Sequence, residues 1–338
     1  MTRRLRNQLL ARSTAKTPHE VVRHLGAVQA QDYLGALWAV GQRMAGGNEQ
    51  DVERALAERS IVRTWPLRGT LHFVAAEDVR WMLALLGERV LRKHAPRLKR
   101  EFGITEAVLR RSRKTVTNAL RGGAQLTRPE LYAILANPHA GLHILWHLAH
   151  ESLICFGPRR GKQQTFVLLD EWVPPSEPIS EERALAELAR RYFLGHGPAT
   201  AADFAWWSGL PATIARNAIE SAAPALEQEE DYAIDPRVHL LPPYDEFTVG
   251  YRDREAVLDP AFRASMKAGA EIFQAVVVVN GVVCGTWKRA LDRDRVRVTT
   301  SMARSLKRNE QRALDAAIER YAAYLNFGST PRFRIRKA

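Results

Sequence analysis

Apolar residues recur at helical spacing and then at strand spacing through residues 1–75. Helices are predicted over 18–25, 33–42 and 49–58, and strands over 61–65 and 70–74. The first helix starts at the capping box Thr17-Pro18-His19-Glu20 and stops at Gly26. Pro66-Leu67-Arg68-Gly69 is a turn signal between the two strands. Three helices followed by a hairpin is the plan of a winged helix.

The same order of patterns returns over residues 76–175. Helices are predicted over 76–91, 131–136 and 143–150, and strands over 153–156 and 165–169. Pro96 is expected to interrupt the helical pattern, and Thr127-Arg128-Pro129-Glu130 is a second capping box. The hairpin has the basic tip Gly157-Pro-Arg-Arg-Gly-Lys162.

A third repeat is predicted after the linker signal at 174–178. Its helices are expected over 181–194, 200–207 and 212–222, with Trp206 and Trp207 in the core. The C-terminal part differs: the valine run 275–279 predicts a strand buried on both faces, and Asn280-Gly281 predicts a type I′ turn. Another strand is expected over 296–299 and a helix over 309–325.

These patterns predict an α+β chain that is mainly α, arranged as a clamp. It would have three tandem winged-helix units at residues 1–75, 76–175 and 176–240, and a β-rich unit with a closing helix at 241–338.

The composition is that of a folded protein, with 46% apolar and 26% charged residues in 338. The net charge of +13 favours polyanionic partners, nucleic acid first. Two cysteines, Cys155 and Cys284, exclude a disulfide framework and a thiolate zinc site. No apolar run has the length of a membrane span and no signal peptide is recognisable, so we expect a cytoplasmic, nucleoid-associated protein.

Cations are concentrated in two strips. Residues 88–114 hold ten Lys/Arg against three Glu, and residues 286–308 hold eight against two Asp. With so few opposite charges, phosphate contact is favoured over a merely solvated face. The residues predicted to contact DNA are Arg63, Arg68, Arg97, Lys99, Arg100, Arg110, Arg111, Arg113, Arg159, Arg160, Lys162, Arg252, Lys288 and Arg289.

Gln29 and Gln31 lie between the first two predicted helices. Side chains at i and i+2 diverge in a helix but point the same way in an extended link. Two neutral amides in such a link can converge on one water or sugar oxygen. The alternative is two solvated side chains without a function.

The run Leu25–Ala39, LGAVQAQDYLGALWA, resembles the signature of the AlkZ-like winged-helix DNA glycosylases, which remove bulky alkylation adducts and unhook interstrand crosslinks. The family's catalytic motif is Gln, an apolar residue, then Gln or Asp, and Gln29-Ala30-Gln31 is its Gln/Gln form. Further matching stretches follow in order at 63–72, 157–162, 240–247, 250–254 and 285–289.

The resemblance implies hydrolysis of the N-glycosidic bond of N7-alkylated purines, with Gln29 and Gln31 positioning the water. Gln31 occupies the position that is Asp in the other branch and is expected to lie closest to that water. We expect a monofunctional enzyme without a cofactor, acting as a monomer on double-stranded DNA that carries alkylated or crosslinked purines.

Three further residues are candidates, and two of them have equally good structural explanations. His72, Tyr244 and Asp245 are candidates for active-site support. His72 is equally well explained as a buried structural histidine, and Asp245 as a helix N-cap or a partner of Arg252 or Arg254. The histidines at 139, 143, 147 and 150 share a helical spacing, but no zincin glutamate or cysteine cluster accompanies them, so no metal is predicted.

A competing interpretation is a non-enzymatic winged-helix DNA-binding protein, either a transcriptional regulator or a damage-binding protein. The candidate recognition helix at 212–222 argues against a regulator, because only Arg216 and Asn217 are suited to reading bases. Three units in one chain also suit an enclosing clamp better than an operator-reading dimer.

Overall fold

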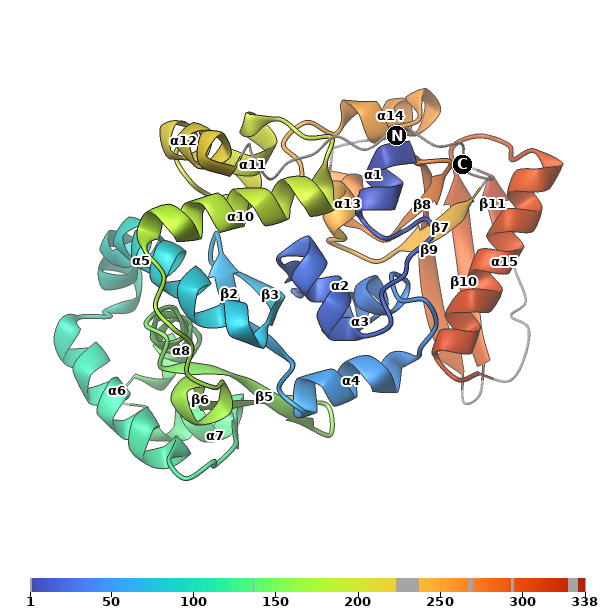
Figure 1. Ribbon diagram of the computed structural model, residues 1–338. Coiled ribbons are helices and arrows are strands. Elements are labelled where there is room, and N and C mark those ends of the chain that lie inside the picture. Colours follow the sequence, from blue (N-terminus) through green and yellow to red (C-terminus); the bar gives the residue numbers. More distant parts are fainter. Residues whose placement is uncertain are drawn as a thin grey trace.

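The N-terminal helices and a small sheet occupy the middle of the molecule (Figure 1). The computed structural model describes residues 2–135, 137–222, 237–266, 270–292, 295–327 and 334–337. The elements of this first part are α1 (Thr2–Asn7), α2 (Pro18–Leu25), β1 (Val28–Gln29), α3 (Tyr33–Gly41), α4 (Glu49–Ala57), β2 (Ile61–Leu67) and β3 (Thr70–Ala75). The three strands form an antiparallel sheet in the order β1-β3-β2.

Local signals set the ends of these elements. The Thr17 hydroxyl accepts from the Glu20 N–H at 3.2 Å, and Gly26 ends α2 with a φ of 77°, as predicted. The turn between β2 and β3 is shorter than expected, since β2 continues through Pro66 to Leu67. A register shift after Thr64 accommodates the proline, which has no N–H to give to a ladder.

The second part repeats this order of elements at the lower left of Figure 1. Its elements are α5 (Val79–Phe102), α6 (Glu106–Leu120), β4 (Leu126–Thr127), α7 (Arg128–Ile134), α8 (Gly141–His150), β5 (Ile154–Arg160), β6 (Gln163–Leu168) and α9 (Leu169–Trp172). The sheet order β4-β6-β5 matches that of the first sheet. Ala136, the predicted end of one helix, lies outside the described residues.

The expected interruption at Pro96 is wrong, because the 24-residue helix α5 continues through this proline. Pro96 lies in an exposed stretch of the helix. There the carbonyl that loses its N–H partner can bond to water, and the rest of the helix continues by tertiary packing. The predicted start at Ala76 is a 3-10 turn, Ala76–Asp78, that precedes α5.

The third part lies at the upper left of Figure 1 and consists of α10 (Glu181–His196), α11 (Ala201–Ser208) and α12 (Ala212–Ala222). Trp207 is fully buried, in one core with Tyr192, Val62 and Leu67. Trp206 is 43% exposed, so the expectation of two core tryptophans is wrong for this residue. Of the residues described between α9 and Val238, none forms a strand.

A five-stranded sheet, in the order β11-β10-β9-β8-β7, forms the C-terminal part. Its elements are β7 (Val238–Leu241), α13 (Glu246–Val249), α14 (Pro260–Ser265), β8 (Val276–Val279), β9 (Val282–Asp292), β10 (Arg295–Met302), α15 (Arg308–Tyr324) and β11 (Arg334–Lys337). The valine strand is buried throughout, and Asn280 and Gly281 both have positive φ, as the predicted turn requires. The predicted boundary after residue 240 falls inside β7.

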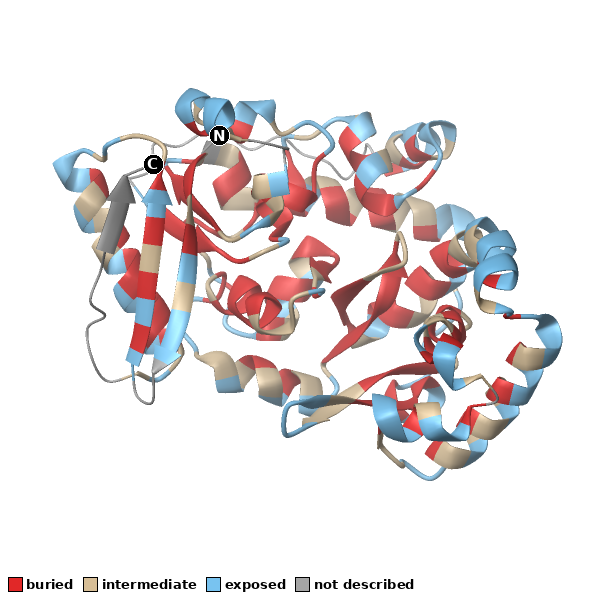
Figure 2. Cartoon of the chain, turned by 180° about the vertical axis from the view of Figure 1, so that it is seen from behind, coloured by how far each residue is buried: buried red, intermediate tan, exposed pale blue. Residues whose placement is uncertain are grey.

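The predicted α+β, mainly helical class is confirmed by this architecture. Its division into winged-helix units with the stated limits stays a prediction. Figure 2 shows buried residues along the inner elements and exposed ones on the outer helices. Cys155 and Cys284 are buried and unpaired with each other. Within the described residues, no helix combines the length and the apolar character needed to cross a bilayer.

Candidate active site

The Gln29–Gln31 segment is the end of β1 and the start of the link to α3. Gln29 is opposite His72 on β3, and the Ala30 N–H donates to the Leu71 carbonyl at 2.7 Å. Ala30 is buried, whereas Gln29 is half-buried and Gln31 exposed, which is the two-residue alternation of an extended chain. Neither glutamine amide has a hydrogen-bond partner among the described side chains and backbone.

Glu246 holds the backbone of this segment from the other side. Its Oε1 accepts the Gln29 N–H at 2.9 Å, and its Oε2 accepts from His196 Nε2 and Trp207 Nε1, each at 3.1 Å. Burial alone raises the pKa of Glu246, but the hydrogen bonds from His196 and the Gln29 N–H lower it to about 2. The carboxylate is therefore ionised at neutral pH although it is fully buried.

His72 is neutral in this site. Burial, and then the nearby Arg68 guanidinium, lower the pKa of His72 to about 4. Its Nδ1 lies 2.9 Å from the Thr70 carbonyl, which only accepts, so Nδ1 carries the proton. The remaining Nε2 is then an acceptor, buried and without a partner in the described structure. The residue paired with Gln29 across the sheet therefore has an unprotonated ring nitrogen.

Arg63, predicted to contact DNA, is only 6% exposed. Its guanidinium donates to the Ala30 carbonyl at 2.8 and 3.2 Å and lies over the rings of Tyr33 and Phe156. Burial lowers its pKa to about 10, so it stays charged. In this structure Arg63 supports the link that carries Gln31.

Asp245 and Tyr244 precede Glu246 but make different contacts. Asp245 is buried and forms two hydrogen bonds to Arg43, at 2.7 and 2.8 Å. It also caps α13 through the Phe247 N–H, so the N-cap alternative is present while the ion-pair partner is Arg43. Tyr244 is partly exposed, with a φ of 60° and its ring beside Phe273.

The predicted DNA-contacting cations fall into two groups. Several bond within the protein: Arg97 and Arg100 to Glu101, Arg113 to Glu151, Arg159 to Glu53, Arg160 to Glu130, Arg289 to Tyr321, and Arg68 to the Trp207 carbonyl. Others are exposed with no side-chain partner in the described structure: Lys99, Arg110, Arg111, Lys162, Arg252 and Lys288. The side chains of the second group have no intramolecular ion pair that a phosphate contact would have to replace.

Three of the four clustered histidines make contacts within the protein. His143 packs on Phe102, His147 bonds to Glu151 at 3.1 Å, and His150 bonds to the Trp146 carbonyl at 2.8 Å. The described residues contain no group of three or more potential ligands suited to a metal ion.

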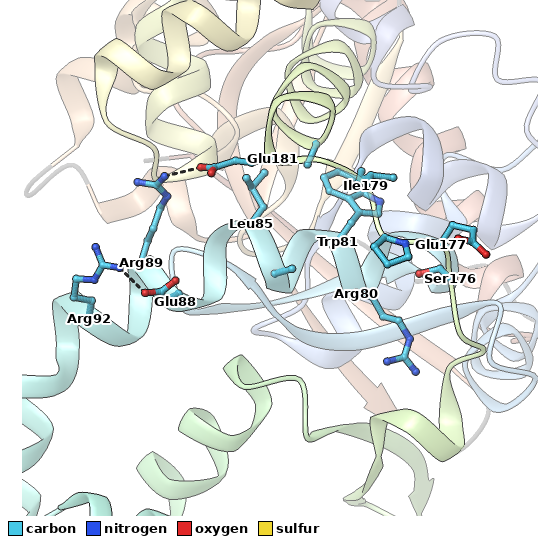
Figure 3. Close-up of a pocket in the computed structure, with 13 residues that line it drawn as sticks. Arg80, Trp81, Leu85, Glu88, Arg89, Arg92, Ser176, Glu177, Ile179 and Glu181 are labelled. Carbon is cyan, nitrogen blue, oxygen red and sulfur yellow. Dashed lines mark hydrogen bonds and ion pairs between the residues drawn. The ribbon is translucent and has the colours of Figure 1, made fainter.

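A separate hollow of about 570 Å³ lies between α5 and the segment that leads into α10 (Figure 3). The three arginines of its lining are held in ion pairs, Arg80 with Asp170, Arg89 with Glu181 and Arg92 with Glu88. Its lining includes neither Gln29 nor Gln31. It is therefore distinct from the candidate active site.

Comparison with known proteins decides the family. The model of the family described as "DNA glycosylase AlkZ-like" matches residues 22–324. The chain belongs to the AlkZ-like DNA glycosylase family. It is 27% identical to the interstrand DNA cross-link repair glycosylase of Streptomyces sahachiroi, over 84% of this chain and 85% of that protein. The solved structure of the DNA glycosylase AlkZ from Streptomyces sahachiroi superposes with a TM-score of 0.79 at 23% identity, over 99% and 98% of the two chains.

Family membership confirms the resemblance seen in the sequence. The roles of individual residues stay predictions. Sequence reasoning selected Tyr244 and Asp245 from the stretch at 240–247 and passed over Glu246, whose carboxylate reaches the motif. The available signal was a second acid placed directly before the apolar Phe247, where a charge is expensive to bury unless it has a partner.

Proposed function

We propose that this protein hydrolyses the N-glycosidic bond of N7-alkylated purines in duplex DNA and unhooks bulky adducts or interstrand crosslinks. Gln29 and Gln31 would position the attacking water. The observation that carries the proposal is the pair of unpartnered amides on the open side of a firmly held link, in a member of this family.

The chemistry needs little from the protein. Alkylation at N7 places a positive charge on the purine, so the leaving group is already activated. What remains is to hold a water against C1′ and to stabilise the oxocarbenium-like sugar. A glutamine amide is no base at neutral pH, but its oxygen accepts a hydrogen bond from water and its nitrogen donates one. Because the motif supplies amides and no amine, we propose a monofunctional glycosylase.

The surroundings of the motif support this role. Ala30 is fixed by β3 on its N–H and by Arg63 on its carbonyl. The neutral His72 Nε2 lies on the strand position opposite Gln29, where it can accept from the Gln29 amide nitrogen. The Gln29 oxygen would then be directed to the water. The exposed, unpaired cations would hold the phosphates of the duplex.

The test is base release from duplex DNA with a single N7-methylguanine, followed by alkali cleavage of the abasic site. Gln31→Ala should lower the single-turnover rate by about 10²-fold, the loss typical of one positioning contact in a transition state. Gln29→Ala should also be slow. Gln50→Ala, an exposed glutamine on α4, is the matched control and should retain the wild-type rate.

The assay also separates the alternatives. If wild type binds the damaged duplex and releases no base from it, or from a bulkier N7 adduct or crosslink, the chain is a damage-binding protein. Equal rates for wild type and both glutamine variants would refute the water-positioning role while leaving the enzyme intact.

A further inference from the structure

The Glu246 carboxylate connects three parts of the chain at one buried point. It lies on α13, and its partners are the Gln29 N–H of β1, His196 at the end of α10 and Trp207 on α11. Gln29 and Glu246 are 217 positions apart in the sequence. Of these three partners, Gln29 belongs to the proposed catalytic motif. Its backbone N–H, not its side-chain amide, donates to Glu246.

The geometry explains why the backbone of Gln29 needs a partner. The β1 strand is only two residues long and lies at the edge of its sheet. Successive N–H groups of an edge strand point to opposite sides: that of Ala30 reaches β3, and that of Gln29 points outward. A partly buried outward N–H without an acceptor would cost free energy, and a two-residue ladder is weak by itself. Glu246 supplies that acceptor.

The ionised state of Glu246 makes this contact strong. Hydrogen bonds to a carboxylate are roughly twice as strong as those between neutral groups. Three N–H donors converge on the two carboxylate oxygens, so the side chain has no freedom to leave Gln29. Displacement of reacting groups by about 1 Å is enough to slow an enzyme 10²-fold.

We infer that Glu246 is a positioning residue for base release, which fixes the backbone of Gln29 and thereby the point from which its amide reaches the water. This inference rests on the proposed role of Gln29. Glu246 does not act on the substrate itself, since it is fully buried beneath the motif.

The test compares Glu246→Gln with Asp78→Asn. Asp78 is a matched control: it is buried, it accepts from a tryptophan, Trp81, and from Arg191, and it has no hydrogen bond to the motif. Both variants should be less stable. At a temperature where both are folded, Glu246→Gln should lower the single-turnover rate on the N7-methylguanine duplex at least 10-fold with DNA affinity unchanged within about twofold, while Asp78→Asn keeps the rate.

A double variant shows whether Glu246 acts through Gln29. Gln29→Ala combined with Glu246→Gln should be no slower than Gln29→Ala alone, because the positioned amide is already gone. If the fold-loss in rate of the double variant equals the product of the losses of the two single variants, the inference is overturned. A folded Glu246→Gln that reacts at the wild-type rate would overturn it as well. If Glu246→Gln does not fold, Glu246→Asp keeps the charge on a shorter side chain and is tested in the same way.

Failure of the inference is distinct from failure of the proposed function. If Gln29→Ala and Gln31→Ala are slow but folded Glu246→Gln is fast, only the positioning role is wrong. If the two glutamine variants are as fast as wild type, the water-positioning proposal is wrong and the inference falls with it.

Discussion

The two three-stranded sheets have the same strand order, but the connection after the short first strand is three residues longer in the first sheet than in the second. In both, a short strand pairs with the second strand of a hairpin, β1 with β3 and β4 with β6. In the second part α7 begins at Arg128, directly after β4, and Thr127 caps it with Glu130. In the first part, residues 30–32 separate β1 from α3. That link displays Gln31, so a common framework gains a candidate active site by lengthening one connection.

The two hairpin turns differ in how far they are exposed. Arg68 and Gly69 of the first hairpin are packed inward: Arg68 bonds to the Trp207 carbonyl, and the Gly69 carbonyl accepts from Trp146 at 3.0 Å. Gly161 and Lys162 of the second hairpin are exposed. The turn of the first hairpin is therefore packed against the rest of the protein, whereas the tip of the second hairpin is exposed.

The largest expected difference between the sheets concerns their arginines. Arg63→Met should lower the free energy of unfolding by about 2 kcal/mol, since it removes two charge-assisted hydrogen bonds to Ala30. It should also slow base release at least 10-fold. The exposed Arg160→Met in the second hairpin should change stability by no more than about 0.5 kcal/mol. Denaturant unfolding measures both, and equal losses would remove the contrast between the sheets.

A second comparison uses one buried histidine from each part. Burial lowers the pKa of His72 and of His150 to about 4, from an ordinary value of 6.5. Between pH 6.5 and 4 the unfolded chain therefore binds these protons more readily, and stability falls as the pH falls. His72→Gln and His150→Gln should each reduce that loss by on the order of 2 kcal/mol.

Activity should distinguish these two histidines. His72 is opposite Gln29, so His72→Gln should also slow base release at neutral pH, whereas His150→Gln, on α8, should not. Thermal unfolding from pH 4.5 to 7.5, with base release at pH 7, makes both measurements. An active His72→Gln would reduce His72 to a structural histidine.

The smallest expected effect concerns the hairpin tips. Lys162→Met should leave stability unchanged and make the slope of log K for DNA against log salt shallower by about 0.9, the value for one phosphate contact. Arg68→Met should lower the stability and leave this slope unchanged, because the Arg68 guanidinium is bonded to the protein backbone. Salt titrations of binding to undamaged duplex separate the two, and an unchanged slope for Lys162→Met would exclude the tip from the phosphate contacts.

Several features of this protein were determined by the sequence alone. The start of α2 at Thr17, its stop at Gly26 and the turn at Asn280-Gly281 depend on hydrogen bonds and φ angles within a few residues, so the local pattern predicts them. The Gln29-x-Gln31 spacing belongs to the same class, because alternation along an extended chain is a local property.

Only the tertiary structure decided what surrounds that motif. The sequence does not show that Glu246, 217 positions away, accepts the Gln29 N–H, that Asp245 pairs with Arg43, or that Arg63 turns inward to Ala30. The sequence also predicted an interruption at Pro96, but α5 continues through this residue. Charged side chains are buried only where partners from distant elements satisfy them, and those partners are set by how the parts of the chain pack together.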